Sequence, residues 1–387
     1  MPRAVRALLL SVLLSAVCTP VAATAKVPRE FFGVMIDGPA TETPGVLERE
    51  APRMRARGPR TVRFAIDWAA AQPYASFDQV PEGERERFTD VGGVPTDFSR
   101  SDRIVRLLAA GRLRPFPVIL HAPDWAAKFP GPFYQAGRYG SPPASPRTYA
   151  RFVAALARRY GPSGTLWRSI TPSKRRPIRD WQIWNEPNLG QYWSEKNFQR
   201  GYVPLLRASR KAIRAVDRKA RIVTGGLTNG ASSTAWTALR RIYEAGGKGT
   251  FDVVALHPYT RNANGVRATI RSTRKVTRDK GQGRMPILLS EISFSSSDGE
   301  SPDRKTFATW DTSEGGQADR LRSTLKMVVR ERRRLRISGV LWYTWLSPDV
   351  QKGRWSDYAG LSRLDGHRIV RKPALLSFQR TVRQLSR

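Results

Sequence analysis

The sequence predicts an α/β protein folded as a single (β/α)8 barrel, the TIM barrel. Eight short apolar or β-rich runs recur along the chain, and amphipathic segments of helical period separate most of them. No linker rich in Pro, Ser or Gly and no break in composition divides residues 26–387. Strand and helix that alternate through one uninterrupted unit of this size are typical of a parallel barrel surrounded by helices.

The elements follow one another in a regular order. The expected strands are residues 31–36, 61–66, 115–120, 178–184, 221–224, 251–256, 286–289 and 337–343. The expected helices are residues 102–110, 149–160, 203–216, 235–245, 317–335 and 373–385. In the second of these helices, Phe152, Val153 and Leu156 recur on one face, which is the pattern of a helix packed on a sheet.

Three strand-to-helix connections are long: residues 67–101, 121–148 and 293–316. In a (β/α)8 barrel, these connections lie at the carboxyl ends of the strands and build the functional site. A fourth long connection, 161–176, leads from helix to strand and is expected at the opposite end, where we expect no chemistry.

Residues 1–25 have the pattern of a cleaved export segment. Arg3 and Arg6 form a basic start, residues 7–17 are apolar, and Ala23-Thr24-Ala25 fits a cleavage site for small residues. The apolar stretch is shorter than the about 20 residues that span a bilayer. We therefore expect a secreted, extracellular product, residues 26–387, without a membrane anchor. Cys18 is the only cysteine, so that product has no disulfide, no catalytic thiol and no thiolate metal site.

The charge is strongly positive. The chain has 67 Lys and Arg against 32 Asp and Glu, a net charge of +35, and loss of Arg3 and Arg6 leaves +33. Such a charge attracts anionic polymers, including acidic polysaccharide and wall polymer. The alternative is that arginine is spread over solvated helix faces. No zinc-finger, RNP or basic-zipper motif is present, so we expect no specific nucleic-acid partner.

Two glutamates stand at the carboxyl ends of different expected strands. Glu186 lies in Asn185-Glu186-Pro187-Asn188 after residues 178–184, and Glu291 follows residues 286–289. Glycosidic bond cleavage requires two such carboxyl groups, one to protonate the leaving oxygen and one to attack the sugar. We expect burial and the charge of Glu291 to raise the pKa of Glu186.

Further candidates support the two glutamates. Arg63 lies inside the second strand, where a charge must be paired, and pairing with a catalytic glutamate would hold that carboxylate ionised; a purely structural ion pair is the alternative. His121 and His257 close the third and sixth strands, either as site residues or as buried hydrogen-bonding histidines. Tyr259 follows closely and can donate to a nucleophilic carboxylate. The spacing contains no metal-binding motif, so we expect no metal and no cofactor.

Aromatic residues near the expected site are candidates for stacking on sugar rings. Trp125 lies in the long connection after the third strand, and Trp342 and Trp345 follow the last strand beside Tyr343. The alternative for each loop aromatic is that it only folds its loop onto the barrel. Packing in the core is the alternative for one of the two tryptophans at the last strand.

These motifs together resemble clan A of the retaining glycoside hydrolases, built on a (β/α)8 barrel. In that clan the acid/base glutamate follows strand four and the nucleophile follows strand seven, the positions of Glu186 and Glu291 here. The chain is most similar to glycoside hydrolase family 39 and to family 5-like enzymes. The matching motifs are Ala122-Pro123-Asp124-Trp125-Ala126, Trp184-Asn185-Glu186-Pro187-Asn188, Tyr192-Trp193, Gly225-Gly226, His257-Pro258-Tyr259 and Gln317-Ala318.

The resemblance implies an acid/base role for Glu186, a nucleophilic role for Glu291 and a contact from Asn185 to the sugar 2-hydroxyl. It also implies that Arg63 and Tyr259 support the nucleophile. Ile292-Ser293-Phe294 departs from the glycine–tryptophan pair of the family and leaves the substrate open. We expect a monomer that hydrolyses a β-linked oligo- or polysaccharide. A non-catalytic barrel that binds glycan or wall polymer and a transglycosylase with the same residues remain as alternatives.

Overall fold

A computed structural model describes residues 26–131, 140–230, 233–301, 310–349 and 353–387. The expected export segment, residues 1–25, lies outside these ranges and stays a prediction. Within them, no helix combines the length and the apolarity needed to cross a membrane.

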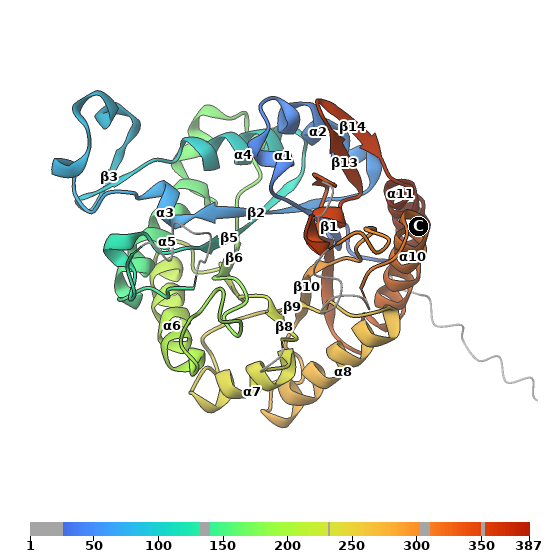
Figure 1. Ribbon diagram of the computed structural model, residues 1–387. Helices are drawn as coiled ribbons and strands as arrows, with labels where there is room; N and C mark the ends of the chain where they lie inside the picture. The colour runs from blue at the N-terminus through green and yellow to red at the C-terminus, as the bar shows by residue number, and fades with distance from the viewer. Residues whose placement is uncertain (1–25, 132–139, 231–232, 302–309, 350–352) are drawn as a thin grey trace, which may run out of the picture.

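A parallel sheet that curves into a barrel forms the centre of the fold (Figure 1). All eight predicted strands are confirmed, and the short strand β8 joins them. The order in the sheet is β7-β6-β5-β2-β1-β11-β10-β9-β8. The bounds are β1 Phe32–Ile36, β2 Thr61–Asp67, β5 Arg114–Leu120, β6 Asp180–Ile183, β7 Arg221–Thr224, β8 Leu227–Thr228, β9 Val254–His257, β10 Ile287–Ile292 and β11 Ile337–Trp342.

The barrel closes between β7 and β9. Val223 forms a parallel bridge to Val253, and the Thr224 amide donates to the Val253 carbonyl over 3.1 Å. The Thr224 hydroxyl accepts a hydrogen bond from the Ala255 amide at 2.9 Å. Closure gathers the carboxyl ends of the strands around one opening, where residues distant in sequence meet.

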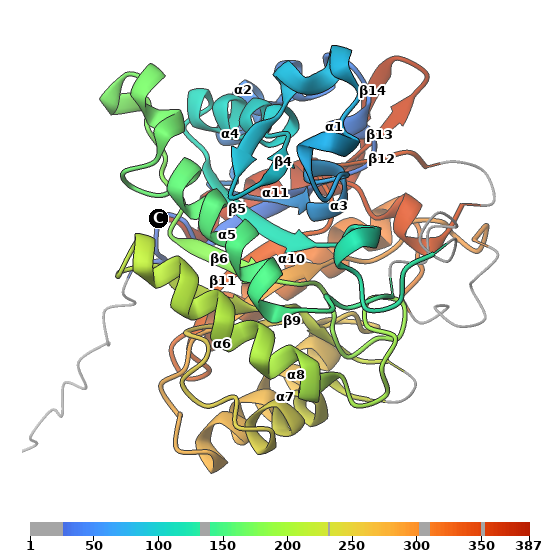
Figure 2. The same cartoon turned by 90° about the vertical axis from the view of Figure 1, so that its left-hand side faces the viewer.

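Helices surround the sheet, as both ribbon views show (Figures 1 and 2). The predicted helices are confirmed with small shifts of their ends. The bounds of all the described α-helices are α1 Pro39–Glu42, α2 Val46–Met54, α3 Trp68–Ala71, α4 Ser99–Ala110, α5 Pro146–Tyr160, α6 Phe198–Val216, α7 Ala235–Glu244, α8 Ala263–Asp279, α10 Glu314–Glu331 and α11 Pro373–Leu385.

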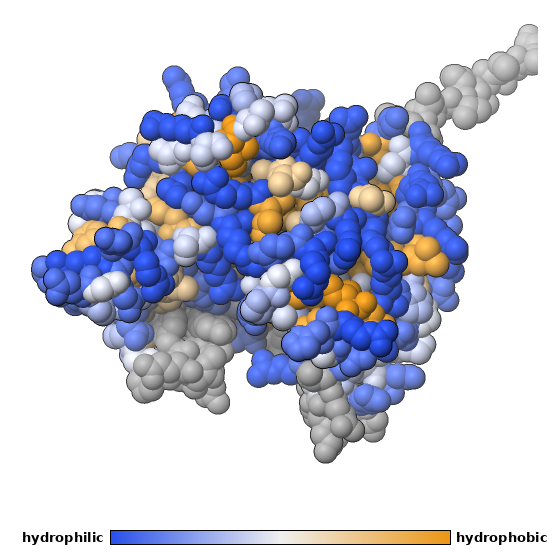
Figure 3. Space-filling model, turned by 90° about the horizontal axis from the view of Figure 1, so that it is seen from above, coloured by the Kyte–Doolittle hydropathy of each residue, from blue (hydrophilic) through white to orange (hydrophobic). Residues whose placement is uncertain are grey.

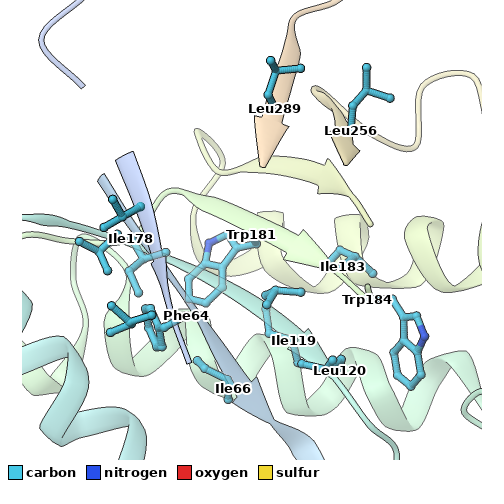
Figure 4. Packing of buried hydrophobic residues seen from close by; sticks show 14 of the residues in the cluster. Phe64, Ile66, Ile119, Leu120, Ile178, Trp181, Ile183, Trp184, Leu256 and Leu289 are labelled. Carbon is cyan, nitrogen blue, oxygen red and sulfur yellow. The ribbon is translucent and has the colours of Figure 1, made fainter. Parts of the chain in front are cut away.

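Two apolar layers hold the barrel together. Side chains such as Phe64, Ile119 and Trp181, on the neighbouring strands β2, β5 and β6, fill the space between sheet and helices (Figure 4). A smaller cluster inside the barrel contains Phe116, Val223, Val253, Ala255 and Leu341. Strand alternation explains the division, because successive side chains point to opposite faces of a sheet.

The barrel interior also explains one glycine of the first strand. A Cβ atom on Gly33 would lie 2.5 Å from the Thr61 carbonyl oxygen and 2.9 Å from Leu341 Cγ. Any larger residue there would push β1 away from its neighbours, so the close approach requires glycine.

Four helices and one long connection are additions to the sequence prediction. The short helices α1 and α3 and the longer helices α2 and α8 were not expected. Helix α8 buries Thr269, Thr273 and Thr277 beside its apolar residues, which weakens the apolar pattern. The connection after β11 is long as well, and it contains β12 Leu346–Ser347, β13 Ser362–Asp365 and β14 Arg368–Arg371. The connection before α4 contains the hairpin of β3 Thr89–Val91 and β4 Val94–Thr96.

The face seen in Figure 3 is mostly hydrophilic, with separate apolar patches. This distribution agrees with the alternative that part of the Lys and Arg surplus covers solvated surface.

Candidate active site

A pocket of about 590 Å³ opens at the carboxyl ends of the strands. It lies where the barrel fold predicts the functional site. Its lining residues are Met35, Asp37, Arg63, Ala65, Val118, Leu120, His121, Asn185, Glu186, Gln191, Tyr192, Tyr259, Glu291, Tyr343, Arg354, Trp355 and Ser356.

The two predicted glutamates meet in this pocket. Glu186 follows β6 and Glu291 lies in β10, and each is only 7% exposed. One carboxylate oxygen of each, together with a ring nitrogen of His257, lies within 4.8 Å of the others. Two carboxyl groups therefore face the same small volume from β6 and β10, which β7 and β9 separate.

The backbone after β6 turns sharply to direct Glu186 inward. Trp184 and Glu186 have positive φ angles of 66° and 39°, which cost non-glycine residues about 1 kcal/mol or more each. Anchored side chains hold this turn. The indole of Trp184 donates to the Tyr192 carbonyl over 2.8 Å, and its amide donates to the Ile119 carbonyl over 2.9 Å.

Arg63 is the central cation of the site, and its side chain is fully buried in β2. Its Nη1 group donates to Glu291 Oε1, and Nη2 donates to Asn185 Oδ1 over 2.9 Å. The Tyr259 hydroxyl donates to the other oxygen of Glu291 over 2.6 Å. Arg63 and Tyr259 thus lie on Glu291, as predicted from sequence, and stabilise its negative charge.

A chain of hydrogen bonds leads from Arg63 to Glu186. Arg63 Nε donates to Gln182 Oε1 over 2.7 Å, so the Gln182 amide nitrogen must face the other way, and it donates to the Ser290 hydroxyl at 3.2 Å. That hydroxyl lies 3.0 Å from His257 Nε2. His257 Nδ1 lies 2.7 Å from Glu186 Oε1.

The direction of this chain favours one histidine tautomer. Because Arg63 can only donate, Gln182 donates to Ser290 and leaves the serine proton free for His257 Nε2. The proton of neutral His257 then sits on Nδ1 and is donated to Glu186 Oε1. Glu186 Oε2 is left to carry a proton toward the pocket.

The protonation states of Glu186 and His257 agree with that assignment. Burial raises the pKa of Glu186, and the charge of Glu291 raises it further, while His257 and Arg63 act in the opposite direction. Burial lowers the pKa of His257 to about 4. At neutral pH, His257 is uncharged and Glu186 has an enhanced tendency to keep its proton.

Glycine at position 226 leaves the space that the ring of His257 occupies. A Cβ atom on Gly226 would lie 1.9 Å from His257 Nε2 and 2.3 Å from Cδ2. Any side chain at this position would displace the ring from both Ser290 and Glu186. Gly226, after β7, is therefore required by the position of the His257 ring.

Asp37 is a third acidic residue of the pocket, and the sequence analysis did not identify it. It follows β1, and its Oδ1 accepts a hydrogen bond from the Thr344 hydroxyl over 2.8 Å. The Tyr343 hydroxyl also bonds to it. Burial raises the pKa of Asp37 to about 6, with a smaller contribution from the charge of Glu291.

The structure also places the remaining candidates. His121 lines the pocket, and its Nδ1 lies 2.8 Å from Asp67 Oδ2. Trp125 packs edge-on against Trp68 at 6.0 Å and donates to the Gln72 carbonyl. Among the described residues, Trp125 is not one that lines the pocket.

Trp342 and Trp345 do not form a floor for a sugar. They are 1% and 0% exposed, and their indoles donate to the Ala359 carbonyl and to Glu50 Oε2. Strand alternation turns Leu341 and Tyr343 toward the barrel axis and Trp342 toward the helices. The prediction for both tryptophans was wrong, and Tyr343 is the pocket residue of this segment.

Trp355 is an aromatic wall of the pocket that the sequence analysis missed. It comes from the long connection after β11. Its ring lies 4.9 Å from that of Tyr259 and 5.3 Å from that of Trp310. Trp310 belongs to the predicted site connection 293–316. A break in the apolar pattern after residue 343 was the available signal for this additional connection.

Glu186, His257 and Glu291 are close enough to suggest metal ligands. However, the guanidinium of Arg63 already binds Glu291 and repels a cation at the same place. The donor set therefore fits an acid–base pair better than a metal site.

No family model matches the sequence, and no curated protein matches it either. Among solved structures, the fold is similar to that of a family 39 glycoside hydrolase from the gut symbiont Bacteroides cellulosilyticus WH2, with a TM-score of 0.60 and 17% identity over 92% of this chain. The match covers 64% of that protein, so this chain spans less than two thirds of its length.

Two further structures show the same likeness. An enzyme of family 39 from Xanthomonas axonopodis pv. citri matches 92% of this chain and 67% of its own at 18% identity and a TM-score of 0.59. A glucosidase from Croceicoccus marinus matches 94% of this chain and 69% of its own at 13% identity and a TM-score of 0.64. The predicted fold, a (β/α)8 barrel, is confirmed.

Proposed function

We propose that this protein is a retaining O-glycoside hydrolase, with Glu186 as acid/base and Glu291 as nucleophile. The observation that carries the proposal is the approach of the two carboxyl groups to within 4.8 Å between oxygens. Retaining enzymes hold these groups about 5–5.5 Å apart, whereas inverting enzymes separate them by about 6.5–9.5 Å to admit a water molecule.

In the first step, ionised Glu291 attacks the anomeric carbon while Glu186 gives its proton to the leaving oxygen. A covalent glycosyl ester forms on Glu291, and the leaving group departs as an alcohol. Arg63 and Tyr259 stabilise the carboxylate before attack and orient it toward the pocket.

In the second step, Glu186 acts as a base. Formation of the ester removes the charge of Glu291, which is one of the causes that raise the pKa of Glu186. The pKa of Glu186 therefore falls once the ester exists, and the carboxylate can accept a proton from water. That water attacks the anomeric carbon, releases the sugar and restores ionised Glu291.

The neighbouring residues fit roles in substrate binding. The Asn185 side chain accepts a hydrogen bond from Arg63 and is proposed to contact the sugar 2-hydroxyl. His121 and Trp355 line the same pocket, as a hydrogen-bonding and a stacking group. We propose a β-linked oligo- or polysaccharide as substrate, a monomeric enzyme and export through residues 1–25.

The variant Glu291→Ala tests the division of roles. We expect it to lose turnover, and added azide should restore activity as a glycosyl azide of inverted configuration, because azide takes the place of the nucleophile. Normal turnover by Glu291→Ala would overturn the proposal. Glycan binding by the double variant Glu186→Gln/Glu291→Gln, together with no hydrolysis by the native chain, would support a non-catalytic barrel instead.

A further inference from the structure

Two adjoining hollows occupy the amino-terminal end of the barrel, opposite the pocket. The first, of about 700 Å³, lies between the start of β1, the segment before β2 and the end of α11. The second, of about 660 Å³, lies between the segments that precede β10 and β11. They share Lys26 and Pro28, so they form one continuous surface, the amino-end face.

The charge of the described side chains that line these two hollows has a single sign. No Asp or Glu is among the described residues that line either hollow. A third, smaller hollow that shares Pro28 contains Glu30 and Asp180, and both of these acids are paired with Arg114. In the whole chain, 67 basic residues stand against 32 acidic ones, so a random selection of ten charged residues would include about three acids. The basic residues that line the face are Lys26, Arg29, Arg55, Arg60, Arg284, Arg332, Arg333, Arg336, Arg383 and Arg387.

Elsewhere in the molecule, arginine is often neutralised. Arg103 binds both oxygens of Glu48, and Arg210 and Arg214 share Asp252. On the amino-end face, Arg29, Arg284, Arg333 and Arg383 are exposed. Within the described part of the chain, none of these four has an acidic group within 4.0 Å.

Crowding of cations on this face is energetically unfavourable without a counter-charge. Burial lowers the pKa of Arg60, and the nearby positive charges of Arg55 and Arg29 lower it further. An anionic ligand would remove that repulsion. Guanidinium groups bind carboxylate, sulfate and phosphate oxygens in a bidentate manner.

We propose that the amino-end face is a second binding site, which takes a polyanionic glycan whose acidic groups occupy the two hollows. Repeated acidic groups suit two hollows that share a border, because one chain can engage both and gain from multivalency. This site is separate from the proposed catalytic pocket and does not depend on the proposed hydrolase activity.

The lining favours a glycan over a single-stranded nucleic acid. Nucleic-acid channels combine cations with aromatic side chains on which bases stack. The one aromatic residue among the described residues of both hollows is Phe32, which is 2% exposed. A chain of acidic sugars needs only the oxyanion contacts that this face supplies.

The position of the face gives a functional consequence. The hollows lie at the amino ends of the strands, whereas the pocket lies at their carboxyl ends. A protein held on a polyanionic matrix by this face keeps its pocket turned away from the matrix. The polymer therefore binds at one end of the barrel, and the substrate enters the pocket at the other end.

The quadruple variant Arg29→Gln/Arg284→Gln/Arg333→Gln/Arg383→Gln tests the site. Its partner variant, Arg147→Gln/Arg151→Gln/Arg158→Gln/Lys211→Gln, removes the same charge from the groove between α5 and α6, which also lacks acidic residues among its described lining. All eight residues are exposed. Binding of each protein to polygalacturonate, dextran sulfate, polyphosphate, neutral dextran and single-stranded DNA is measured at about 0.05 M and about 0.5 M salt.

We expect the native chain to bind at least one acidic glycan and not neutral dextran, with weaker binding at high salt. The amino-end variant should bind about tenfold more weakly or worse, while the groove variant stays within about twofold of the native chain. Polygalacturonate, dextran sulfate and polyphosphate separate carboxylate, sulfate and phosphate as the recognised group. Thermal unfolding and circular dichroism verify that both variants are folded.

Three outcomes would overturn the proposal. Equal loss in both variants would show that net charge alone attracts the polymer. Tighter binding of DNA than of every acidic glycan would assign the face to nucleic acid. No salt-dependent binding of any polyanion would leave the face without this function. Hydrolysis of a small aryl glycoside is followed in parallel, so that failure of the binding proposal is distinguishable from failure of the hydrolase proposal.

Discussion

The two ends of the barrel each contain a buried carboxylate bound by arginine, but the two carboxylates have different surroundings. At the amino end, Asp180 accepts hydrogen bonds from Arg221 Nε and Nη2 at 2.6 Å each and from Arg114 Nη2 at 2.6 Å. At the carboxyl end, Glu291 is bound by Arg63 and by the hydroxyl of Tyr259.

The difference lies in how completely each carboxylate is neutralised. Two guanidinium groups surround Asp180, and the hollow beside it is about 170 Å³. Glu291 has one guanidinium and one neutral phenol, and it opens into the pocket of about 590 Å³. A carboxylate that is bound by two guanidinium groups stabilises the fold. A carboxylate that is only partly neutralised and faces a cavity is available for reaction.

The largest expected effect is at Glu291. Replacement by Gln keeps the size of the side chain but removes the nucleophile, so kcat should fall by about 10⁴-fold or more. Steady-state kinetics on an aryl glycoside measures the fall. The same variant leaves the fully buried Arg63 without its ion-pair partner, so urea unfolding should also show a loss of about 3–5 kcal/mol. Retention of kcat by the folded variant would make Glu291 a structural residue like Asp180.

At the second carboxyl of the pocket, the effect should depend on the substrate. Glu186→Gln removes the acid that protonates the leaving oxygen, so kcat/KM should fall about 10²- to 10⁴-fold for substrates with poor leaving groups. The phenolate of an activated aryl glycoside leaves without a proton, so the first step with these substrates should be affected far less. The kcat/KM values for a series of aryl glycosides with different phenols measure how the loss depends on the leaving group, and equal losses throughout would contradict an acid role.

Asp180→Asn should lower the stability without lowering kcat. Removal of the charge leaves Arg114 and Arg221 close together without a shared anion. Because both side chains keep contact with water, the expected loss is about 2 kcal/mol, below the about 3–5 kcal/mol of a fully buried pair. Urea unfolding measures the loss, while kcat of the folded enzyme should stay unchanged. A fall in kcat at native stability would break the contrast between the two ends.

Much of the fold follows from the sequence because buried strands and amphipathic helices have strong periodic patterns. The strand before Glu186 and the strand before Glu291 were predictable as apolar runs, and the order of the strands placed both acids at one end. Helix α8 was missed because its buried face includes threonines, which blur the apolar stripe. The segment after β11 was misjudged because its tryptophans pack outward against Ala359 and Glu50.

The site was only partly predictable for a different reason. Arg63 and Tyr259 could be assigned because a charge in a strand and a phenol after a strand need explanations. Asp37 precedes Gly38-Pro39 and therefore has the local pattern of a turn residue. Its hydrogen-bond partner Thr344 lies 307 positions later, so no nearby residue indicated a role in the pocket. Ser290 is a small residue in a strand, and its contact with His257 exists only once the barrel closes.

Ser290→Ala tests the link between Arg63 and Glu186. Without the hydroxyl, the Nδ1–H tautomer of His257 loses its stabilising partner, and Nδ1 can then accept the acid proton of Glu186. We expect kcat to fall about tenfold with KM nearly unchanged, and Ser290→Thr should retain most of the activity. A change in KM alone would mean that Ser290 shapes substrate binding rather than the protonation of Glu186.

The smallest effect is expected at Asp37, whose negative charge lowers the stability of the folded chain because the side chain is partly buried. Its pKa rises from the ordinary 3.8 to about 6 in the folded state, so the folded chain binds more protons than the unfolded chain between these values. Its contribution therefore lowers stability as pH rises from about 4 to about 6 and stays constant above. Asp37→Asn cannot ionise and should be more stable than the native chain at pH above about 6, with a smaller difference near pH 4.

The full shift corresponds to about 3 kcal/mol, and solvent contact of this partly exposed side chain reduces the expected gain to about 1 kcal/mol. Urea unfolding across this pH range measures the difference between the two proteins, and a gain that does not depend on pH would show that ionisation of Asp37 is not its cause.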